Sequence, residues 1–290
     1  MKRRHRISAI IIWILILVFI ALALILLSIK LRQSSQPKIV PEIDNRDISR
    51  TERRIEEARP EQQGQQKRQE HKVRVAIVID DIGYDDRIFR KFVGLGIPLT
   101  FSVLPGERFS TPIAKEARLL NYEVMLHLPM EPHHPLRKPG NGTLLTTMSH
   151  DEMIRLLSKD IEAVPYIVGV NNHMGSLLTE NRAVMNILLE EIHKKGLFFL
   201  DSKTSPDSVA YETARSMGIR SGRRDVFLDN NRDIEYIKGQ IDKVIKMAKK
   251  NGEATAIGHP RPETVTALRE KIPDFKKEGI ELVPVSEILE

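Results

Sequence analysis

The sequence predicts an α/β domain in residues 73–290, built from seven or eight strand–helix units that form either a barrel or an open parallel sheet. Two observations lead to this fold class. Short apolar, β-branched runs alternate with longer segments of helical periodicity. Glycines follow several of the helical segments, where they are typical of helix ends. No internal repeat accompanies this alternation, so the units are expected to form one domain.

The predicted strands are short apolar runs bounded by turn residues or charges. In chain order they are Val73–Asp80, Pro98–Leu104, Tyr122–Leu128, Ile167–Asn172, Leu197–Ser202, Ile219–Leu228, Ala254–Gly258 and Ile280–Val285. Most of the intervening segments have helical periodicity, namely Asp86–Val93, Thr111–Leu120, Glu180–Lys195, Ile234–Lys250 and Glu263–Lys277. Ser149 and Glu152 form a capping-box pattern, which predicts that a further helix begins there and ends before Tyr166.

An uncharged apolar stretch, Ile7–Ile29, precedes the domain. Its 23 residues would cover roughly 30 Å of hydrocarbon as a helix. The basic residues before it favour a cytoplasmic N-terminus. The alternative is a cleaved signal peptide, but the stretch is long for one and no small-x-small cleavage site follows. We therefore predict a single-pass protein with an uncleaved signal anchor in residues 1–30 and its folded domain outside the cytoplasm, in the periplasm or at the cell surface.

Residues 31–72 are polar and rich in Gln, Glu, Arg and Lys, with no sustained apolar period. Such a segment cannot bury enough apolar surface to fold alone. We predict a largely disordered stalk between the anchor and the domain.

The composition excludes several classes of function. The 290 residues include no cysteine, so disulfides, thiolate metal sites and cysteine nucleophiles are excluded. Any bound metal must then be held by His, Asp or Glu. The net charge of +6 comes largely from the first seventy residues, and no basic patch with interleaved aromatic residues occurs. Nucleic-acid binding is therefore not predicted.

Two adjacent carboxylates, Asp80 and Asp81, end the first predicted strand. Like charges this close resist joint ionisation, so one pKa should rise unless a cation lies between them. This arrangement suits a metal ligand beside a general base. The alternative for either residue is a helix N-cap, where Asp is favoured.

Polar residues also end four other predicted strands. Each has a simple structural explanation on its own, such as a hydrogen-bonded histidine, a helix cap or a turn. The carboxyl ends of parallel strands, however, lie on one face of such a domain, where active sites are built. Together they predict a divalent metal held by oxygen and imidazole ligands, with acid–base groups beside it. These strand ends carry His127, Asn171-Asn172-His173, Asp201 and His259.

Several of these segments occur in the order found in a known family. VAIVIDDIGYD, FSVLPG, EVMLHLPMEP, GVNNHMGS, FLDSKT and AIGHPRPET together resemble the divergent branch of the polysaccharide deacetylases of the NodB-homology type, a carbohydrate esterase superfamily. The resemblance covers Val73–Glu290 and leaves the anchor and the stalk outside. It implies an irregular (β/α)7–8 barrel and a divalent metal, with zinc as the expected ion.

The resemblance also implies roles for individual residues. It points to Asp80 as the general base and to Asp81 as a metal ligand. The second motif of the family is His-x-x-x-His, with both histidines on the metal. Here His127 matches the first, whereas Glu131 replaces the second. His173 is the substitute expected for the third ligand, because it ends a neighbouring strand, and Glu131 is the alternative.

The terminal motif of the family is matched by Ile257-Gly258-His259, so His259 corresponds to the proton-donating histidine. Asp201 resembles a family aspartate that orients a catalytic group. The usual Arg-x-Pro segment has no clear match in NNHMGS.

The predicted function is metal-dependent hydrolysis of N- or O-acetyl groups on an extracytoplasmic polysaccharide, such as a peptidoglycan-like glycan. Two other classes stay open. One is a degenerate member that binds a glycan or an envelope partner without turnover. The other is a glycosidase on the same fold, which needs two suitably spaced carboxylates, and Asp80 with Asp201 or Glu131 could serve.

Overall fold

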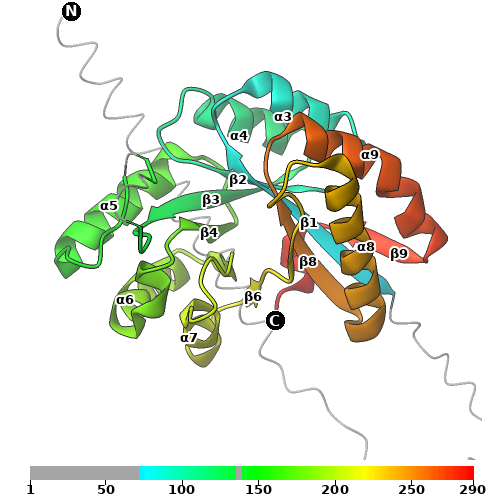
Figure 1. Cartoon of the computed structure of the whole chain (residues 1–290). Coiled ribbons are helices and arrows are strands. Elements are labelled where there is room, and N and C mark those ends of the chain that lie inside the picture. The colour runs from blue at the N-terminus through cyan, green and yellow to red at the C-terminus, as the bar shows by residue number, and fades with distance from the viewer. Residues whose placement is uncertain (1–71, 135–138, 141) are drawn as a thin grey trace, which may run out of the picture. The chain divides into compact units, whose positions relative to one another are not determined.

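Parallel strands and helices alternate along the computed structural model, which describes residues 72–134, 139–140 and 142–290 (Figure 1). The strands are β1 (Val73–Ile82), β2 (Thr100–Val103), β3 (Glu123–Met130), β4 (Gly169–Met174), β5 (Phe198–Asp201), β6 (Ser221–Arg223), β7 (Val226–Phe227), β8 (Glu253–Gly258) and β9 (Ile280–Val283). The α-helices are α3 (Asp86–Val93), α4 (Ser110–Leu119), α5 (His150–Ala163), α6 (Arg182–Lys194), α7 (Ala210–Ser216), α8 (Ile234–Asn251) and α9 (Pro262–Lys277). Two short 3-10 helices are η1 (Leu178–Glu180) and η2 (Val285–Ile288).

All these strands form one parallel sheet in the order β6-β5-β4-β3-β2-β1-β8-β7, with β9 paired to β1. The two outer strands, β6 and β7, are successive in the chain. This segment pairs with β5 through its first half and with β8 through its second half. The sheet is thus a half-barrel. Its two outer strands are connected through the chain but are not hydrogen-bonded to each other in the described structure.

The single strand predicted for Ile219–Leu228 is therefore wrong in one respect. The predicted range contains both β6 and β7, but between them the backbone changes partners. Arg224 N donates to Asp201 O on the β5 side, and Asp225 N donates to Thr255 O on the β8 side, each at 2.9 Å. The backbone stays extended where it switches neighbours, so the sequence does not reveal the break. We refer to Ser221–Phe227 as the seam segment.

The strands are apolar on both faces because both faces are covered. The helices surround the outer face of the curved sheet (Figure 1). Val75, Ile77 and Ile79 of β1 belong to the large buried cluster that includes residues of those helices. Ala76 and Val78 point the other way and join a smaller inner cluster with Met125, Leu200 and Ile257. The alternation continues one step further, so Asp80 follows Val78 on the inner face.

The end of the chain fills the lower half of this inner face. Strand β9 pairs with the first half of β1, and Val285 and Ile288 then enter the inner cluster. The backbone N–H of Val285 donates to Thr100 Oγ1 at 3.0 Å, and the backbones of Ser221 and Glu290 exchange two hydrogen bonds. Apolar residues thus occupy the inner face below Asp80 and leave polar residues at the carboxyl ends of the strands.

The other predicted elements agree with the structure to within a few residues. The capping box predicted at Ser149 is present and begins α5. Two differences stand out. The helix predicted from Glu180 begins at Arg182, because Asn181 caps it after the turn η1. Helix α7 was not predicted.

Within the described residues, no helix has the length and apolar character needed to cross a membrane. The predicted anchor, Ile7–Ile29, lies outside the described residues, and so does the predicted stalk apart from its last residue.

Candidate metal centre and acid–base site

Asp80 and Asp81 both face the site because β1 contains a bulge. Adjacent residues of a regular strand point to opposite faces. Ile79 pairs with Phe101 and Ile82 pairs with Val103, so three steps along β1 match two steps along β2. Asp81 takes up the extra residue with φ at 55°, in the left-handed region that few non-glycine residues adopt. The bulge therefore brings the second carboxylate beside the first.

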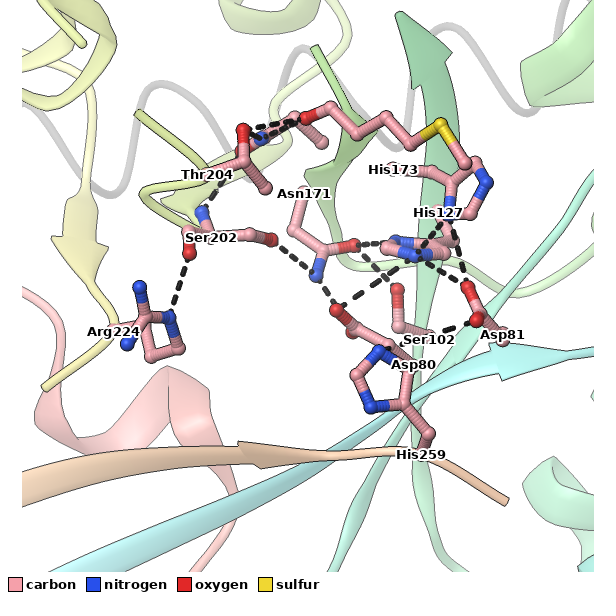
Figure 2. A network of polar contacts seen from close by, with 12 residues as sticks. Asp80, Asp81, Ser102, His127, Asn171, His173, Ser202, Thr204, Arg224 and His259 are labelled. Atoms are coloured by element: carbon pink, nitrogen blue, oxygen red, sulfur yellow. Dashed lines mark hydrogen bonds and ion pairs between the residues drawn. The ribbon is translucent and has the colours of Figure 1, made fainter. Parts of the chain in front are cut away.

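Three ligand atoms from different strands meet at Asp81. Asp81 Oδ1 lies 3.1 Å from His127 Nε2 and 2.9 Å from His173 Nδ1, and those two nitrogens are 3.1 Å apart. Figure 2 shows the three side chains turned toward one another. The adjacent strands β3 and β4 carry the histidines, with His173 paired to Pro129 in register. The sequence predicted this set, with His173 as the third ligand.

These residues fit a divalent cation. Ligand atoms bound tetrahedrally to zinc at about 2.0–2.1 Å lie roughly 3.3 Å from one another, which is close to the spacing found here. Oxygen and imidazole nitrogen are ligands that zinc accepts. His127 Nδ1 donates to Asn171 Oδ1 at 2.8 Å, so in the neutral imidazole the lone pair is on Nε2, toward Asp81. Three lone pairs this close require a proton or a metal ion among them.

The charges of the site favour an ionised Asp81. Burial by itself raises the pKa of Asp81, but the hydrogen bonds and charges of His127 and His173 outweigh it. The pKa of this carboxyl is consequently held well below its usual range. An anionic ligand is thus available to a metal ion throughout the physiological pH range.

Asn171 connects the metal ligands to Asp80. Its side chain is fully buried and uses all of its hydrogen-bonding capacity. Oδ1 accepts hydrogen bonds from His127 Nδ1 and Ser102 Oγ. Nδ2 donates to Asp80 Oδ1 at 2.8 Å and to Ser202 Oγ at 3.1 Å. One amide therefore fixes the tautomer of a ligand histidine and the orientation of the neighbouring carboxylate, a typical role for a group just outside the ligand shell.

Asp80 is buried beside the three ligands. Its Oδ2 lies 3.7 Å from His127 Nε2. Burial raises the pKa of Asp80 above its ordinary value, and the nearby imidazoles of His127 and His259 lower it without cancelling that effect. A carboxylate with a raised pKa is a stronger proton acceptor than an ordinary one.

His259 faces the same centre from the end of β8, which pairs with β1 on the side away from β3 and β4. Its Nε2 lies 4.0 Å from Asp81 Oδ2, whereas Nδ1 donates to Asp229 Oδ1 at 2.7 Å. Asp229 is fully buried, and its Oδ2 accepts from the backbone of His259 and from Thr264 Oγ1. Burial lowers the pKa of His259, but the hydrogen bond and charge of Asp229 outweigh it and raise that pKa overall. His259 can thus carry a proton on the nitrogen that faces the centre.

The sequence model of the divergent polysaccharide deacetylases matches residues 77–289, which include every residue of this centre. The chain belongs to this family. A protein of Escherichia coli strain K12 named as uncharacterized (YibQ) is 36% identical over 218 residues, covering 74% of this chain and 67% of its own length. An uncharacterized protein of Haemophilus influenzae is 33% identical over 210 residues, covering 72% of this chain and 74% of its own.

The fold of this divergent polysaccharide deacetylase is also found among solved structures. The crystal structure of an uncharacterized protein from Agrobacterium tumefaciens C58 has a TM-score of 0.70 and 26% sequence identity, covering 74% of this chain and 88% of its own. The half-barrel of this chain, with its parallel sheet, therefore also occurs in a solved structure.

Two residues predicted for the site of this deacetylase-family chain lie elsewhere. Asp201 accepts hydrogen bonds from Lys203 N at 2.7 Å and from Ser208 Oγ at 2.7 Å, so it orders the loop after β5. Glu131 accepts from Thr146 N and Thr146 Oγ1, at 2.7 and 2.6 Å, and so orders the loop after β3. Neither carboxylate is among the grouped ligand atoms, and the carboxylate that holds the ring of His259 belongs to Asp229.

The sequence reasoning missed Asp229 and the role of Asn171. Asp229 directly follows the predicted strand Ile219–Leu228, so the strand-end criterion applied to the other strands would have found it. Asn171 lies two residues before His173 and therefore on the same face of β4. A neutral amide carries no signal of its own in a single sequence, since buried asparagines are also common structural residues.

Two residues of the seam segment, Arg224 and Phe227, help to position His259. Arg224 Nε donates to Ser202 O at 2.7 Å, and a second guanidinium nitrogen donates to Lys203 O at 2.8 Å. The same guanidinium lies 3.6 Å from the centroid of the Phe227 ring, which in turn stacks on His259 with an interplanar angle of 22°. Arg224 thus connects the end of β5 to β7, where no hydrogen-bonded ladder joins the two ends of the described sheet.

A cavity of about 410 Å³ opens over these groups. Asp80, Asp81, His127, His173 and His259 all line it. Its volume lies within the range of small-molecule sites, roughly 300–1,000 Å³.

Proposed function

We propose that the protein is a metal-dependent hydrolase that removes acetyl groups from an extracytoplasmic polysaccharide. One observation carries the proposal. The ligand atoms of Asp81, His127 and His173 converge beside the buried carboxylate of Asp80 and opposite Nε2 of His259. A cation site flanked by a proton acceptor and a proton donor is the set of groups that hydrolysis of an amide or ester requires.

Asp81, His127 and His173 would hold a divalent ion, with zinc as the ion proposed. When bound, such an ion polarises the acetyl carbonyl and lowers the pKa of water, which provides a nucleophile at neutral pH. Asn171 keeps the Nε2 lone pair of His127 directed at the ion, because it accepts the proton of Nδ1.

Asp80 acts as the general base. Its Oδ1 is held by Asn171, which leaves Oδ2 on the side of the metal ligands. His259 acts as the general acid, with Nδ1 held by Asp229 and Nε2 directed into the cavity. The imidazolium donates its proton to the leaving amine or alkoxide. Asp229 stabilises that imidazolium and restores the orientation of the ring after the transfer.

The two other function classes receive less support. A glycosidase needs a second carboxylate across the scissile bond, yet Asp201 and Glu131 hydrogen-bond within their own loops and neither lines the cavity. A degenerate binding protein was suggested by the loss of the second family histidine to Glu131. His173 supplies an imidazole at the same centre, so the ligand count is retained.

The test is acetate release from acetylated glycans by the full chain in detergent, after stripping and after reconstitution with zinc. Zinc-dependent release supports the proposal. Asp80→Asn and His259→Ala should each lose about 10²–10⁴-fold in rate while zinc remains bound, as expected for general acid–base groups. Stoichiometric zinc with no acetate release from any glycan tested would favour the non-catalytic class, and shortened chains without acetate would favour a glycosidase.

The location of the activity forms part of the proposal. The long apolar stretch Ile7–Ile29 and its basic flank would anchor the chain with residues 73–290 outside the cytoplasm. Acetylated envelope polysaccharides are accessible to a domain in that position.

A further inference from the structure

Arg261 is the one Lys or Arg among the residues that line the cavity in the described part of the chain. It follows His259-Pro260 and precedes α9, which begins at Pro262. About a third of its side chain is exposed, at 32%. The acid–base machinery described above does not use it.

The backbone holds Arg261 firmly. Prolines on both sides restrict the local conformation, and Arg261 is extended with φ at −116° and ψ at 143°. Its backbone N–H donates to His259 O at 2.8 Å. The guanidinium donates through one nitrogen to Asp229 O at 2.5 Å. The cation is therefore placed at the cavity before any substrate arrives, which lowers the entropy cost of using it.

Most of the donors of this guanidinium remain available. An arginine has five N–H donors, and among the described residues the side chain of Arg261 has one hydrogen bond, to a backbone oxygen. The carboxylate of Asp229 lies 4.0 Å away and already accepts from His259 and Thr264. The charge of Arg261 is thus not neutralised by a close ion pair within the described structure.

The balance of charges in the cavity then favours the binding of one anion. The two carboxylates that line it, Asp80 and Asp81, would be balanced by a divalent ion. Arg261 adds a fixed positive charge beside His259, close to where the leaving group of the reaction must lie. A planar guanidinium recognises a carboxylate through two parallel N–H···O bonds.

We propose that Arg261 makes the site selective for acetylated sugars that carry a carboxylate close to the acetyl group. The inference rests on the proposed function and names its substrate class. Two kinds of glycan have this chemistry. N-acetylmuramic acid carries a lactyl carboxylate on the oxygen of the carbon next to the one that bears the acetamido group. O-acetylated uronic acids carry a carboxylate on the sugar ring itself.

The experiment compares each anionic glycan with its own neutral form. The probes are peptide-free strands of N-acetylglucosamine and N-acetylmuramic acid, and an O-acetylated polyuronate. Each is used as such and after conversion of its carboxylates to methyl amides. The zinc-loaded full chain in detergent is assayed for acetate release, and the ratio of kcat/KM for the anionic to the neutral form is the readout.

The wild-type ratio should be roughly 10–100 for at least one of the two glycans, as one charge-assisted contact allows. Arg261→Gln should bring that ratio to about one. Arg261→Lys keeps the positive charge but cannot donate two parallel hydrogen bonds, so it should give an intermediate ratio. Arg232→Gln is the matched control. Arg232 is an exposed arginine that pairs with Glu263 of α9, the helix that Arg261 precedes, and it is absent from the lining of the cavity.

A ratio near one for both glycans in the wild type would overturn the inference, and so would an Arg261→Gln variant with the wild-type ratio. Calorimetric binding of the same four probes to Asp80→Asn protein, with and without Arg261→Gln, separates this result from failure of the proposed function. An absence of acetate release would sink the hydrolase proposal, whereas the ratio of binding constants would still test Arg261. High salt should reduce the preference.

Discussion

Replacing Asn171 by Asp separates the two tasks of one side chain. The oxygen that takes the place of Oδ1 can still accept from His127 Nδ1 and Ser102 Oγ, so the ligand histidine keeps its tautomer. The oxygen that takes the place of Nδ2 faces Asp80 Oδ1 at 2.8 Å and can no longer donate to it. The substitution therefore leaves the metal side intact and damages the base.

The magnitude follows from those contacts. A hydrogen bond to a charged group contributes about 1.5–3 kcal/mol, and this one is lost. Two unit charges about 3 Å apart repel by roughly 5 kcal/mol at an effective dielectric constant of about 20. The two carboxylates will consequently share one proton near neutral pH, as close pairs of carboxyl groups do. A base that holds a proton is inactive, so acetate release should fall by about 10²–10⁴-fold.

Zinc affinity, measured by competition with a chromophoric chelator, is the second readout. Asn171→Asp should bind zinc about as tightly as the wild type. Asn171→Ala also removes the acceptor of His127 Nδ1, so it should bind zinc about 10–100-fold more weakly. Equal loss of zinc in both variants would refute the division of tasks. Wild-type acetate release by Asn171→Asp would refute the link to Asp80.

Four further predictions concern the ligands, the acid, the stability and the topology. His173→Ala should abolish zinc binding measured by mass spectrometry, whereas Glu131→Ala should keep full occupancy, and the reverse pattern would make Glu131 the third ligand. Asp229→Asn should lose at least about 10-fold in acetate release with zinc retained, because His259 loses its charged partner; a wild-type rate would show that Asp229 does not support the acid. Burial raises the pKa of Asp160 from 3.8 to about 7, so its contribution to stability is fully present below about pH 4 and is lost as the pH rises through 7. Asp160→Asn should remove this decline and be the more stable protein at pH 8 in urea unfolding, and an unchanged pH dependence would contradict this. Protease added to intact spheroplasts should digest residues 73–290, and full protection would overturn the predicted topology.

The order of strands and helices was predictable, because the spacing of apolar residues along the sequence follows which side chains of a strand or helix are buried. Asp80, Asp81, His127, His173 and His259 could be grouped for a similar reason, since the ends of parallel strands share one face. The bulge at Asp81 was not predictable, because nothing in a run of apolar residues records a left-handed backbone angle.

The departures in the second half of the site have a common origin. The seam segment reads as one strand, so the sequence hides the change of partner between β6 and β7. Asp229, which follows the predicted strand, was not among the predicted site residues, whereas Asp201 was, and its carboxylate accepts hydrogen bonds within its own loop. The role of Arg224 could not be predicted, because the sequence does not distinguish an arginine that stacks on a ring from the exposed Arg223 beside it.

The bulge in β1 has a consequence for how this site can diversify. Base and metal ligand are consecutive residues, so their Cα atoms are separated by one peptide unit of about 3.8 Å. Changes in surrounding loops cannot alter this spacing, and a shift of β1 would move both groups together. The acid has no such covalent constraint, because His259 follows β8, the strand next to β1, and its ring is positioned by Asp229 and by the stacked ring of Phe227. Substitutions near the seam segment can therefore reposition the proton donor relative to the metal, and adapt the site to different leaving groups while the hydrolytic half stays the same.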